Sequence, residues 1–213
     1  MRVVFRQRFL EEYVKDKVVL DLGSVEHDLY RDNIKKGRWL FACLQKNAKR
    51  IVGIDFLKEA IAELTVQGYD IRYGDVENLE QLEVNEDFDL IIAGELIEHL
   101  PNPGMFLRSI RKFMAPKTEL VLTTPNAFGF IRFPDALIRR ERTRHDHMAY
   151  YSTQTLKQLL ELHGYEVKEI LFYSFISGKK RSVFLSYVRK FWFSLFPYLS
   201  DGLIFIAKTR SPE

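Results

Sequence analysis

Short apolar segments recur along this chain, and stretches with helical spacing lie between them. The segments that predict strands are Val18–Leu22, Ile51–Asp55, Ile71–Tyr73, Phe88–Ala93, Glu119–Thr123, Glu166–Phe172 and Gly202–Lys208. The first, second, fourth and fifth are nearly continuous runs of Val, Ile and Leu, which is typical of strands covered on both faces. This alternation therefore predicts an α/β fold on a mainly parallel sheet.

Two of the intervening stretches carry apolar stripes with helical spacing, at Phe106–Phe113 and Leu156–His163. The first begins after Pro103 and ends before Pro116, positions where proline is common at helix ends. The second is followed by Gly164, where a left-handed cap residue is expected. Both stretches are predicted to be helices.

Two longer stretches, residues 126–150 and 174–200, fit neither pattern, and we interpret them as insertions. A hydrophobic content of 46% in 213 residues suits a single core. We therefore expect one domain over residues 1–213 that carries the two insertions.

Charge and cysteine content narrow the classes of protein that remain. The net charge of +3 is too small to favour a nucleic-acid partner. The single cysteine, Cys43, excludes an internal disulfide and suits a reducing compartment. Because the N-terminus is charged throughout and no apolar run is long enough to span a membrane, we expect a cytoplasmic protein without a transmembrane segment.

Carboxylates follow the predicted strands in a regular order: Asp21, Asp55, Asp75 and Glu95. The last three are spaced 20 residues apart. Any one of them alone is more commonly a helix N-cap. As a set they would meet at one edge of a parallel sheet, where ligands bind at the switch in strand order.

The chemistry of these residues suggests an adenosine-containing ligand. Asp55 can accept hydrogen bonds from both hydroxyls of a ribose. Asp75 can accept from an exocyclic amine, while the backbone amide of Val76 donates to a ring nitrogen. Gly23 allows the backbone to approach the ligand closely.

Five motifs follow one another in this order: VVLDLGS, VGIDFLKEAI, YGDVENL, FDLIIAGELIEHLPNPGMFLRSIRKFMAP and ELVLTTPN. With them the chain resembles the class I S-adenosylmethionine-dependent methyltransferases, in particular small prokaryotic methyltransferase-domain proteins. The resemblance covers Val18 to Asn126 and His147 to Val167. It implies a Rossmann-like sheet of seven strands, mainly parallel with an antiparallel last strand and helices on both faces, and S-adenosylmethionine as the cofactor.

The resemblance also implies roles for individual residues. The loop that holds the methionine part of the cofactor would contain Asp21, Gly23 and Ser24. The adenosine part would contact Asp55, Phe56 or Leu57, Asp75 and Val76. The positions beside the sulfonium and the substrate would be Ala93, Gly94 and Glu95.

The first loop departs from the family pattern Asp-x-Gly-x-Gly-x-Gly. Only Gly23 is kept, and Val25 and His27 occupy the other glycine positions. Side chains there can narrow the space for the methionine moiety. The alternative function is therefore a non-catalytic module of the same fold that binds a nucleoside or a partner protein. A nicotinamide-dependent oxidoreductase is disfavoured because the Gly-x-Gly-x-x-Gly run is missing.

The candidate catalytic groups are His147, Glu95 and His99. His147 is the first choice for a substrate contact or general base, with Tyr151 as a nearby hydrogen-bonding group. Glu95, Glu98 and His99 also resemble metal ligands, but a third partner would have to come from His145 or His147. Because two ligands are a weak signal, the sequence predicts no metal site.

The acceptor of the methyl group is predicted to be a small molecule, a glycan or a lipid-type compound, modified on oxygen or nitrogen. Residues 182–200 interleave aromatic and basic residues. We interpret them as an insertion whose aromatic side chains pack on the sheet. The alternative is an amphipathic helix that contacts a membrane surface or a lipid-like substrate.

Overall fold

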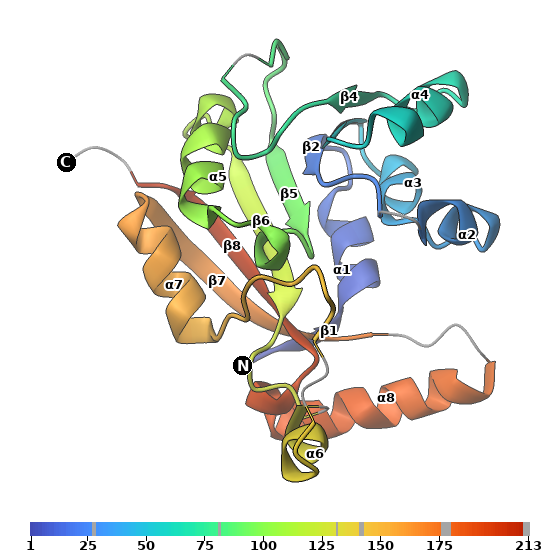
Figure 1. Cartoon of the computed structure of the whole chain (residues 1–213), viewed down its shortest axis with the longest axis vertical. Helices are drawn as coiled ribbons and strands as arrows, with labels where there is room; N and C mark the ends of the chain where they lie inside the picture. The colour runs from blue at the N-terminus through green and yellow to red at the C-terminus, as the bar shows by residue number, and fades with distance from the viewer. Residues whose placement is uncertain (27–28, 81, 131, 141–142, 176–179, 211–213) are drawn as a thin grey trace.

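The computed structural model describes residues 1–26, 29–80, 82–130, 132–140, 143–175 and 180–210 (Figure 1). The strands are β1 Val3–Phe5, β2 Val18–Leu22, β3 Arg50–Asp55, β4 Ile71–Tyr73, β5 Leu90–Gly94, β6 Glu119–Pro125, β7 Tyr165–Ser174 and β8 Gly202–Thr209. The α-helices are α1 Arg6–Tyr13, α2 Tyr30–Lys35, α3 Leu40–Gln45, α4 Lys58–Val66, α5 Pro103–Ser109, α6 Arg132–Leu137, α7 Thr153–Leu162 and α8 Lys180–Leu195. Short 3₁₀ helices are η2 Ile97–His99, η3 Ile110–Phe113 and η4 Pro197–Leu199.

The strands form one sheet of eight in the order β1-β7-β8-β6-β5-β2-β3-β4. All neighbouring pairs are parallel except those of β8, which runs antiparallel to both β6 and β7. The predicted mainly parallel sheet with an antiparallel last strand is therefore confirmed. The structure adds an eighth strand, because Val3–Phe5 pairs with β7 at the edge.

The chain changes direction across the sheet between β2 and β5. From β2 it proceeds to β3 and β4 on one side, whereas β5 and β6 lie on the other side. In open α/β sheets, ligands bind beyond the carboxyl ends of the strands at such a switch point. The carboxyl ends of β2 and β5 therefore define where a ligand is expected.

Helices cover both faces of the sheet, and each face has its own hydrophobic cluster. One cluster packs α5, η3 and α7 against the sheet through residues such as Phe106, Ile110 and Leu156. The other packs α1, α3 and α4 through residues such as Leu10 and Phe41. The two predicted helices are present as α5 with η3 and as α7, and Gly164 has the left-handed φ of +78° expected of a cap.

The two stretches interpreted as insertions lie next to each other (Figure 1). The first contains α6 and the second contains α8 and η4. Phe130 and Trp192 connect them through a ring contact with 5.3 Å between centroids. Among the described helices, none combines the length and the apolar character that a membrane span requires.

The interpretation that the aromatic residues of 182–200 pack on the sheet is wrong for most of them. Phe193 is buried, but Phe184 and Phe191 are 72% and 68% exposed, and Phe196 is also exposed. The reason is that α8 packs against β1 and β7 on one side only, whereas its aromatic residues are distributed around the helix.

Candidate active site

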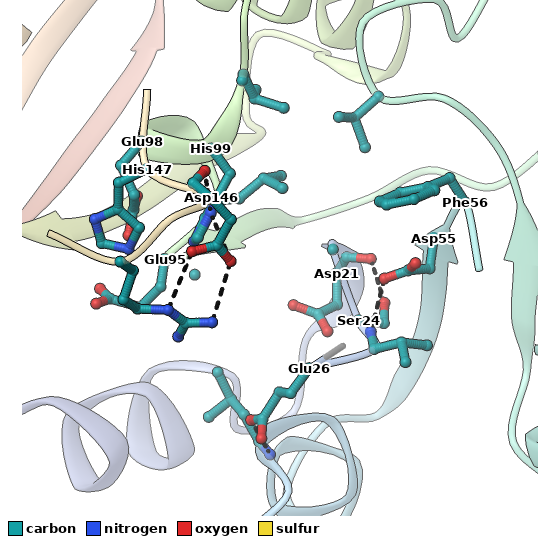
Figure 2. Close-up of a pocket in the computed structure, with 18 of the residues that line it drawn as sticks. Asp21, Ser24, Glu26, Asp55, Phe56, Glu95, Glu98, His99, Asp146 and His147 are labelled. Carbon is teal, nitrogen blue, oxygen red and sulfur yellow. Dashed lines mark hydrogen bonds and ion pairs between the residues drawn. The ribbon is translucent and has the colours of Figure 1, made fainter. Parts of the chain in front are cut away.

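A cavity of about 950 Å³ opens at the carboxyl ends of the parallel strands, at the switch point between β2 and β5. Figure 2 shows two groups of side chains on opposite sides of it. One group contains Asp21, Ser24, Asp55 and Phe56, and the other contains Glu95, Glu98, His99, Asp146 and His147. The volume is within the range of cofactor pockets.

The loop after β2 is a fixed turn. Gly23 has a φ of +72°, which only glycine adopts without strain. The backbone amides of Gly23 and Ser24 both donate to the carbonyl of Ile54. The Ser24 hydroxyl donates to the Asp21 carbonyl at 2.8 Å, and the Trp39 indole donates to the Ser24 carbonyl at 2.9 Å. These hydrogen bonds hold the turn at Gly23 and Ser24.

Val25 occupies the second glycine position, and its side chain packs into the hydrophobic core next to the cavity. It is buried in the cluster that contains Tyr30 and Trp39, although it also lines the cavity. Its backbone amide donates to Oδ2 of Asp55 at 2.8 Å. The amide of Leu57 donates to Oδ1 of the same carboxylate at 3.1 Å. His27 lies outside the described residues.

The cavity is strongly acidic. Carboxylates outnumber arginines along its wall: the acidic residues are Asp21, Glu26, Asp55, Asp75, Glu77, Glu95, Glu98 and Asp146, and the arginines are Arg6 and Arg144. Burial raises the pKa of Asp21 to about 7, although nearby Arg6 lowers it. Such a wall favours a ligand with positive charge and repels a pyrophosphate.

Most residues that the resemblance assigns to the cofactor do line this cavity. They are Asp21, Gly23, Ser24, Asp55, Phe56, Asp75, Val76, Gly94 and Glu95. Leu57 and Ala93 do not, because Leu57 packs against the cluster under α4 and Ala93 is fully buried in the core. Of the two candidates for the adenine contact, only Phe56 lines the cavity, and 57% of its surface is exposed.

Glu95 is held rigidly at the end of β5. Its φ of +54° is unusual for a residue other than glycine. Its Oε1 accepts hydrogen bonds from the hydroxyls of Thr123 at 2.9 Å and Tyr173 at 2.8 Å, and Arg6 lies 3.7 Å away. Strained backbone held by several contacts is a recurrent feature of functional sites.

Glu98 is completely buried beside Glu95. Its Oε2 accepts a hydrogen bond from Thr124 at 3.1 Å. Burial raises its pKa to about 8, and the charge of Glu95 adds to this effect. The backbone carbonyl of Glu98 accepts hydrogen bonds from the amides of Met148 and Ala149. These bonds hold the loop before α7 against η2.

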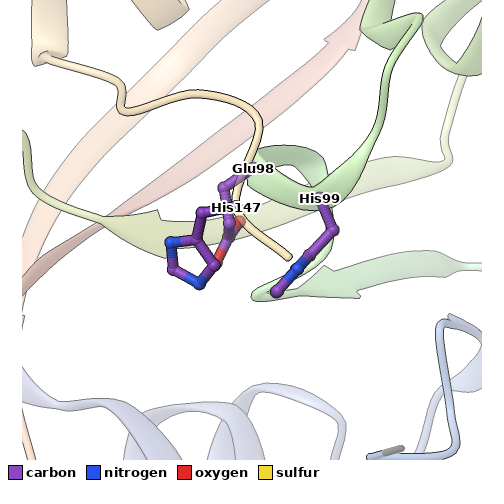
Figure 3. A group of neighbouring side chains, drawn as sticks. All are labelled: Glu98, His99 and His147. Atoms are coloured by element: carbon purple, nitrogen blue, oxygen red, sulfur yellow. The ribbon is translucent and has the colours of Figure 1, made fainter. Parts of the chain in front are cut away.

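That loop places His147 next to His99 (Figure 3). The two imidazole rings are 4.6 Å apart between centroids and nearly perpendicular. Nδ1 of His99 lies 3.0 Å from the carbonyl of Asp146. Burial lowers the pKa of His147, and the neighbouring His99 lowers it further. All three predicted catalytic residues, His147, Glu95 and His99, line the same cavity.

The structure also brings in residues that the sequence did not indicate. Arg6 donates to Thr123 at 2.9 Å from α1, which precedes the first recognised motif, and Tyr173 comes from β7. Neither belongs to a motif, so no sequence signal pointed to them. In contrast, the prediction of Tyr151 as a hydrogen-bonding group in the site is wrong, because Tyr151 is buried in the core and does not line the cavity.

Comparison with known proteins gives consistent results. A relative in Mycolicibacterium smegmatis, described as a probable S-adenosylmethionine-dependent methyltransferase, is 28% identical over 58% of this chain. A ubiquinone biosynthesis O-methyltransferase of Rickettsia typhi is 24% identical over 75% of the chain. The matches span 46% of the first relative's length and 68% of the second's.

The fold agrees with a solved S-adenosylmethionine-dependent methyltransferase from Archaeoglobus fulgidus. The two share a TM-score of 0.61 and 18% identity, over 96% of this chain and 91% of that one. The family model described as a methyltransferase domain matches residues 4–170, which is most of the chain. This chain therefore belongs to the methyltransferase domain family, within the class I S-adenosylmethionine-dependent methyltransferases.

Proposed function

We propose that this chain binds S-adenosylmethionine in the cavity at the switch point and transfers its methyl group to an acceptor hydroxyl. The observation that carries the proposal is the acidic cavity that has Asp55 at the end of β3 and Glu95 at the end of β5. S-adenosylmethionine carries a positive sulfonium, which an acidic wall favours. The family membership supports the same cofactor.

The adenosine half of the cofactor would lie at the β3 and β4 side. Asp55 would accept hydrogen bonds from the ribose hydroxyls through its carboxylate oxygens. Phe56 would contact the adenine face. Asp75 and the amide of Val76 would meet the adenine edge. The methionine half would lie over the loop of Asp21, Gly23 and Ser24.

Methyl transfer requires the acceptor atom to be held in line with the methyl–sulfur bond, which is a matter of positioning. The groups available on the acceptor side are Glu95, His99 and His147. Each can bind a hydroxyl, and His147 or Glu95 can take its proton. Oxygen is favoured over nitrogen as the acceptor because one relative is named as an O-methyltransferase.

A lipid-type acceptor is supported by an exposed apolar surface on α8 and the residue that follows it. We define the α8 surface as Phe184, Leu185, Val188, Phe191, Leu195 and Phe196, all more than 45% exposed. Phe175, just before α8, lines the cavity. Exposed apolar patches of this kind mark lipid or partner surfaces. The sequence of α8 has basic residues and no acidic one, which suits an anionic lipid surface.

The α8 surface predicts binding to anionic vesicles. The wild-type protein should cosediment with phosphatidylcholine vesicles that contain phosphatidylglycerol, and less with phosphatidylcholine alone. Replacing Phe184 and Phe191 together by Ser should weaken this binding at least about tenfold, because each buried phenylalanine contributes roughly 1.5–3 kcal/mol. Leu162→Ser is a matched control, since Leu162 is 81% exposed at the end of α7. Equal binding by the double variant and the control would refute the assignment.

The proposed function itself is tested by calorimetric titration with S-adenosylmethionine and S-adenosylhomocysteine. We expect one molecule of either to bind per chain with micromolar affinity. A labelled methyl donor then serves to screen hydroxyl-bearing acceptors with and without apolar chains. Absence of binding at millimolar cofactor would contradict the proposal and favour a module of the same fold that binds another ligand.

A further inference from the structure

The acceptor side of the cavity holds three side chains with metal-binding atoms: Glu98, His99 and His147 (Figure 3). One ligand atom from each lies within 4.8 Å of the others, and all three residues line the cavity. Ligands about 2.1 Å from one cation lie about 3–3.5 Å from each other. Small side-chain rotations would therefore close the group around an ion.

Two atoms of this group lack the partners that buried polar atoms normally have. Oε1 of Glu98 and Nδ1 of His147 are buried and, among the residues the structure describes, accept or donate no hydrogen bond. Glu98 is also completely inaccessible to solvent. Leaving an oxygen of a buried carboxyl group or a buried ring nitrogen without a partner is costly, so each such atom calls for an explanation. A cation bound between these residues would supply the missing partner.

The surrounding contacts orient the ligands as in known metal sites. The carbonyl of Asp146 can only accept, so Nδ1 of His99 must donate to it, and the neutral ring carries its lone pair on Nε2. The second oxygen of Glu98 accepts from Thr124. Metal-binding histidines almost always donate their other nitrogen to a carbonyl or carboxylate, and ligating carboxylates are themselves hydrogen-bonded.

We propose that Glu98, His99 and His147 bind one divalent cation of the first transition row and leave at least one coordination position open toward the cavity. Two imidazoles and one carboxylate suit Mn²⁺, Fe²⁺, Co²⁺ or Zn²⁺ better than Ca²⁺ or Mg²⁺, which prefer oxygen ligands. Three protein ligands with an open position are typical of catalytic rather than structural sites.

The role of this cation rests on the proposed function. The acceptor hydroxyl would occupy the open position, where the cation lowers the pKa of that hydroxyl. Its proton would pass to Glu95, which lines the same cavity and is not one of the three ligands. The oxygen lone pair then forms the new bond to the methyl carbon while the carbon–sulfur bond breaks. The electrons of that bond remain on sulfur, so the sulfonium becomes the neutral thioether of S-adenosylhomocysteine.

Cation binding is measured without cofactor or acceptor, by titration with Co²⁺ followed by visible absorption and by calorimetry. We expect one Co²⁺ per chain. Glu98→Gln and His147→Gln should each weaken binding about tenfold or more, as disruption of metal sites commonly does. His145→Gln is the matched control, because His145 is exposed two residues away and does not line the cavity. Its affinity should equal that of the wild type.

Two further measurements distinguish loss of the metal site from misfolding and from loss of the cofactor site. Co²⁺ should raise the melting temperature of the wild type and of His145→Gln but not of the two ligand variants, which also shows that the variants fold. Asp55→Asn should lose S-adenosylhomocysteine binding and keep Co²⁺, so failure of the cofactor site is distinguishable from failure of the metal site. No Co²⁺ uptake by the wild type, or equal uptake by Glu98→Gln and His147→Gln, would overturn the proposal.

Discussion

Replacing Asp55 by Asn is expected to weaken S-adenosylmethionine binding about 100-fold or more. In the proposed site this carboxylate accepts from both ribose hydroxyls, and charge-assisted hydrogen bonds contribute roughly 1.5–3 kcal/mol each. An amide can accept at one atom only. Its NH₂ group would also face the amide of either Val25 or Leu57, both of which donate to Asp55. Calorimetric titration with S-adenosylmethionine and S-adenosylhomocysteine measures the loss.

Two other aspartates provide matched controls for Asp55→Asn. Asp75 lines the cavity but is exposed, so Asp75→Asn should weaken S-adenosylmethionine binding about tenfold or less. Asp87 is exposed and does not line the cavity, so Asp87→Asn should bind like the wild type. Near-ultraviolet circular dichroism verifies that each variant is folded. A folded Asp55→Asn protein with wild-type affinity would remove the ribose contact from the proposal.

The sheet was largely predictable because its central strands are continuous apolar runs. Val18–Leu22 and Ile71–Tyr73 have the predicted bounds, and the other predicted strands differ by one or two residues at their ends. The edge strand β1 was missed because three residues between charged neighbours give no periodic signal. Its partner β7 lies more than 160 residues away, so pairing is decided by tertiary structure.

The residues on the cofactor side of the candidate site were easier to predict from the sequence than those on the acceptor side. The side proposed for the cofactor was predictable because Asp21, Asp55 and Asp75 each lie at or near the end of a strand within a recognisable motif. The acceptor side combines groups from distant segments, such as Arg6 and His147. The choice between His145 and His147 depends on hydrogen bonds from the loop before α7 to the carbonyl of Glu98, which no spacing rule contains.

The composition of α8 did not predict which of its aromatic side chains are buried. Burial is the common environment of phenylalanine, which favoured packing on the sheet. A helix that packs on one side can bury only the residues on that side, and in α8 these include Phe193 and Ser186. Phe184 and Phe191 are seven positions apart and so lie on one face of the helix. That face remains exposed, which is why a lipid surface enters the proposed function.

Trp39→Ala is expected to lower the free energy of unfolding by about 3–5 kcal/mol, the usual cost of truncating a buried tryptophan. Trp39 is 1% exposed, stacks on Phe41 with 5.3 Å between ring centroids, and contacts Tyr69 edge-on at 4.8 Å. Its indole also donates to the Ser24 carbonyl. Urea unfolding should show a lower midpoint with an unchanged slope.

Trp39→Phe separates packing from the hydrogen bond to the loop. Phenylalanine keeps much of the ring volume but leaves the Ser24 carbonyl without its donor, so we expect a stability loss of about 1–3 kcal/mol. Because that carbonyl belongs to the turn under the methionine half of the proposed cofactor site, cofactor affinity should fall in both variants. If the urea midpoint of Trp39→Ala instead equals that of the wild type, the Trp39 side chain does not stabilise the fold or this turn. A wild-type affinity in a destabilised Trp39→Phe protein would show that the other hydrogen bonds of the turn, to Ile54, Asp21 and Asp55, are enough to hold it.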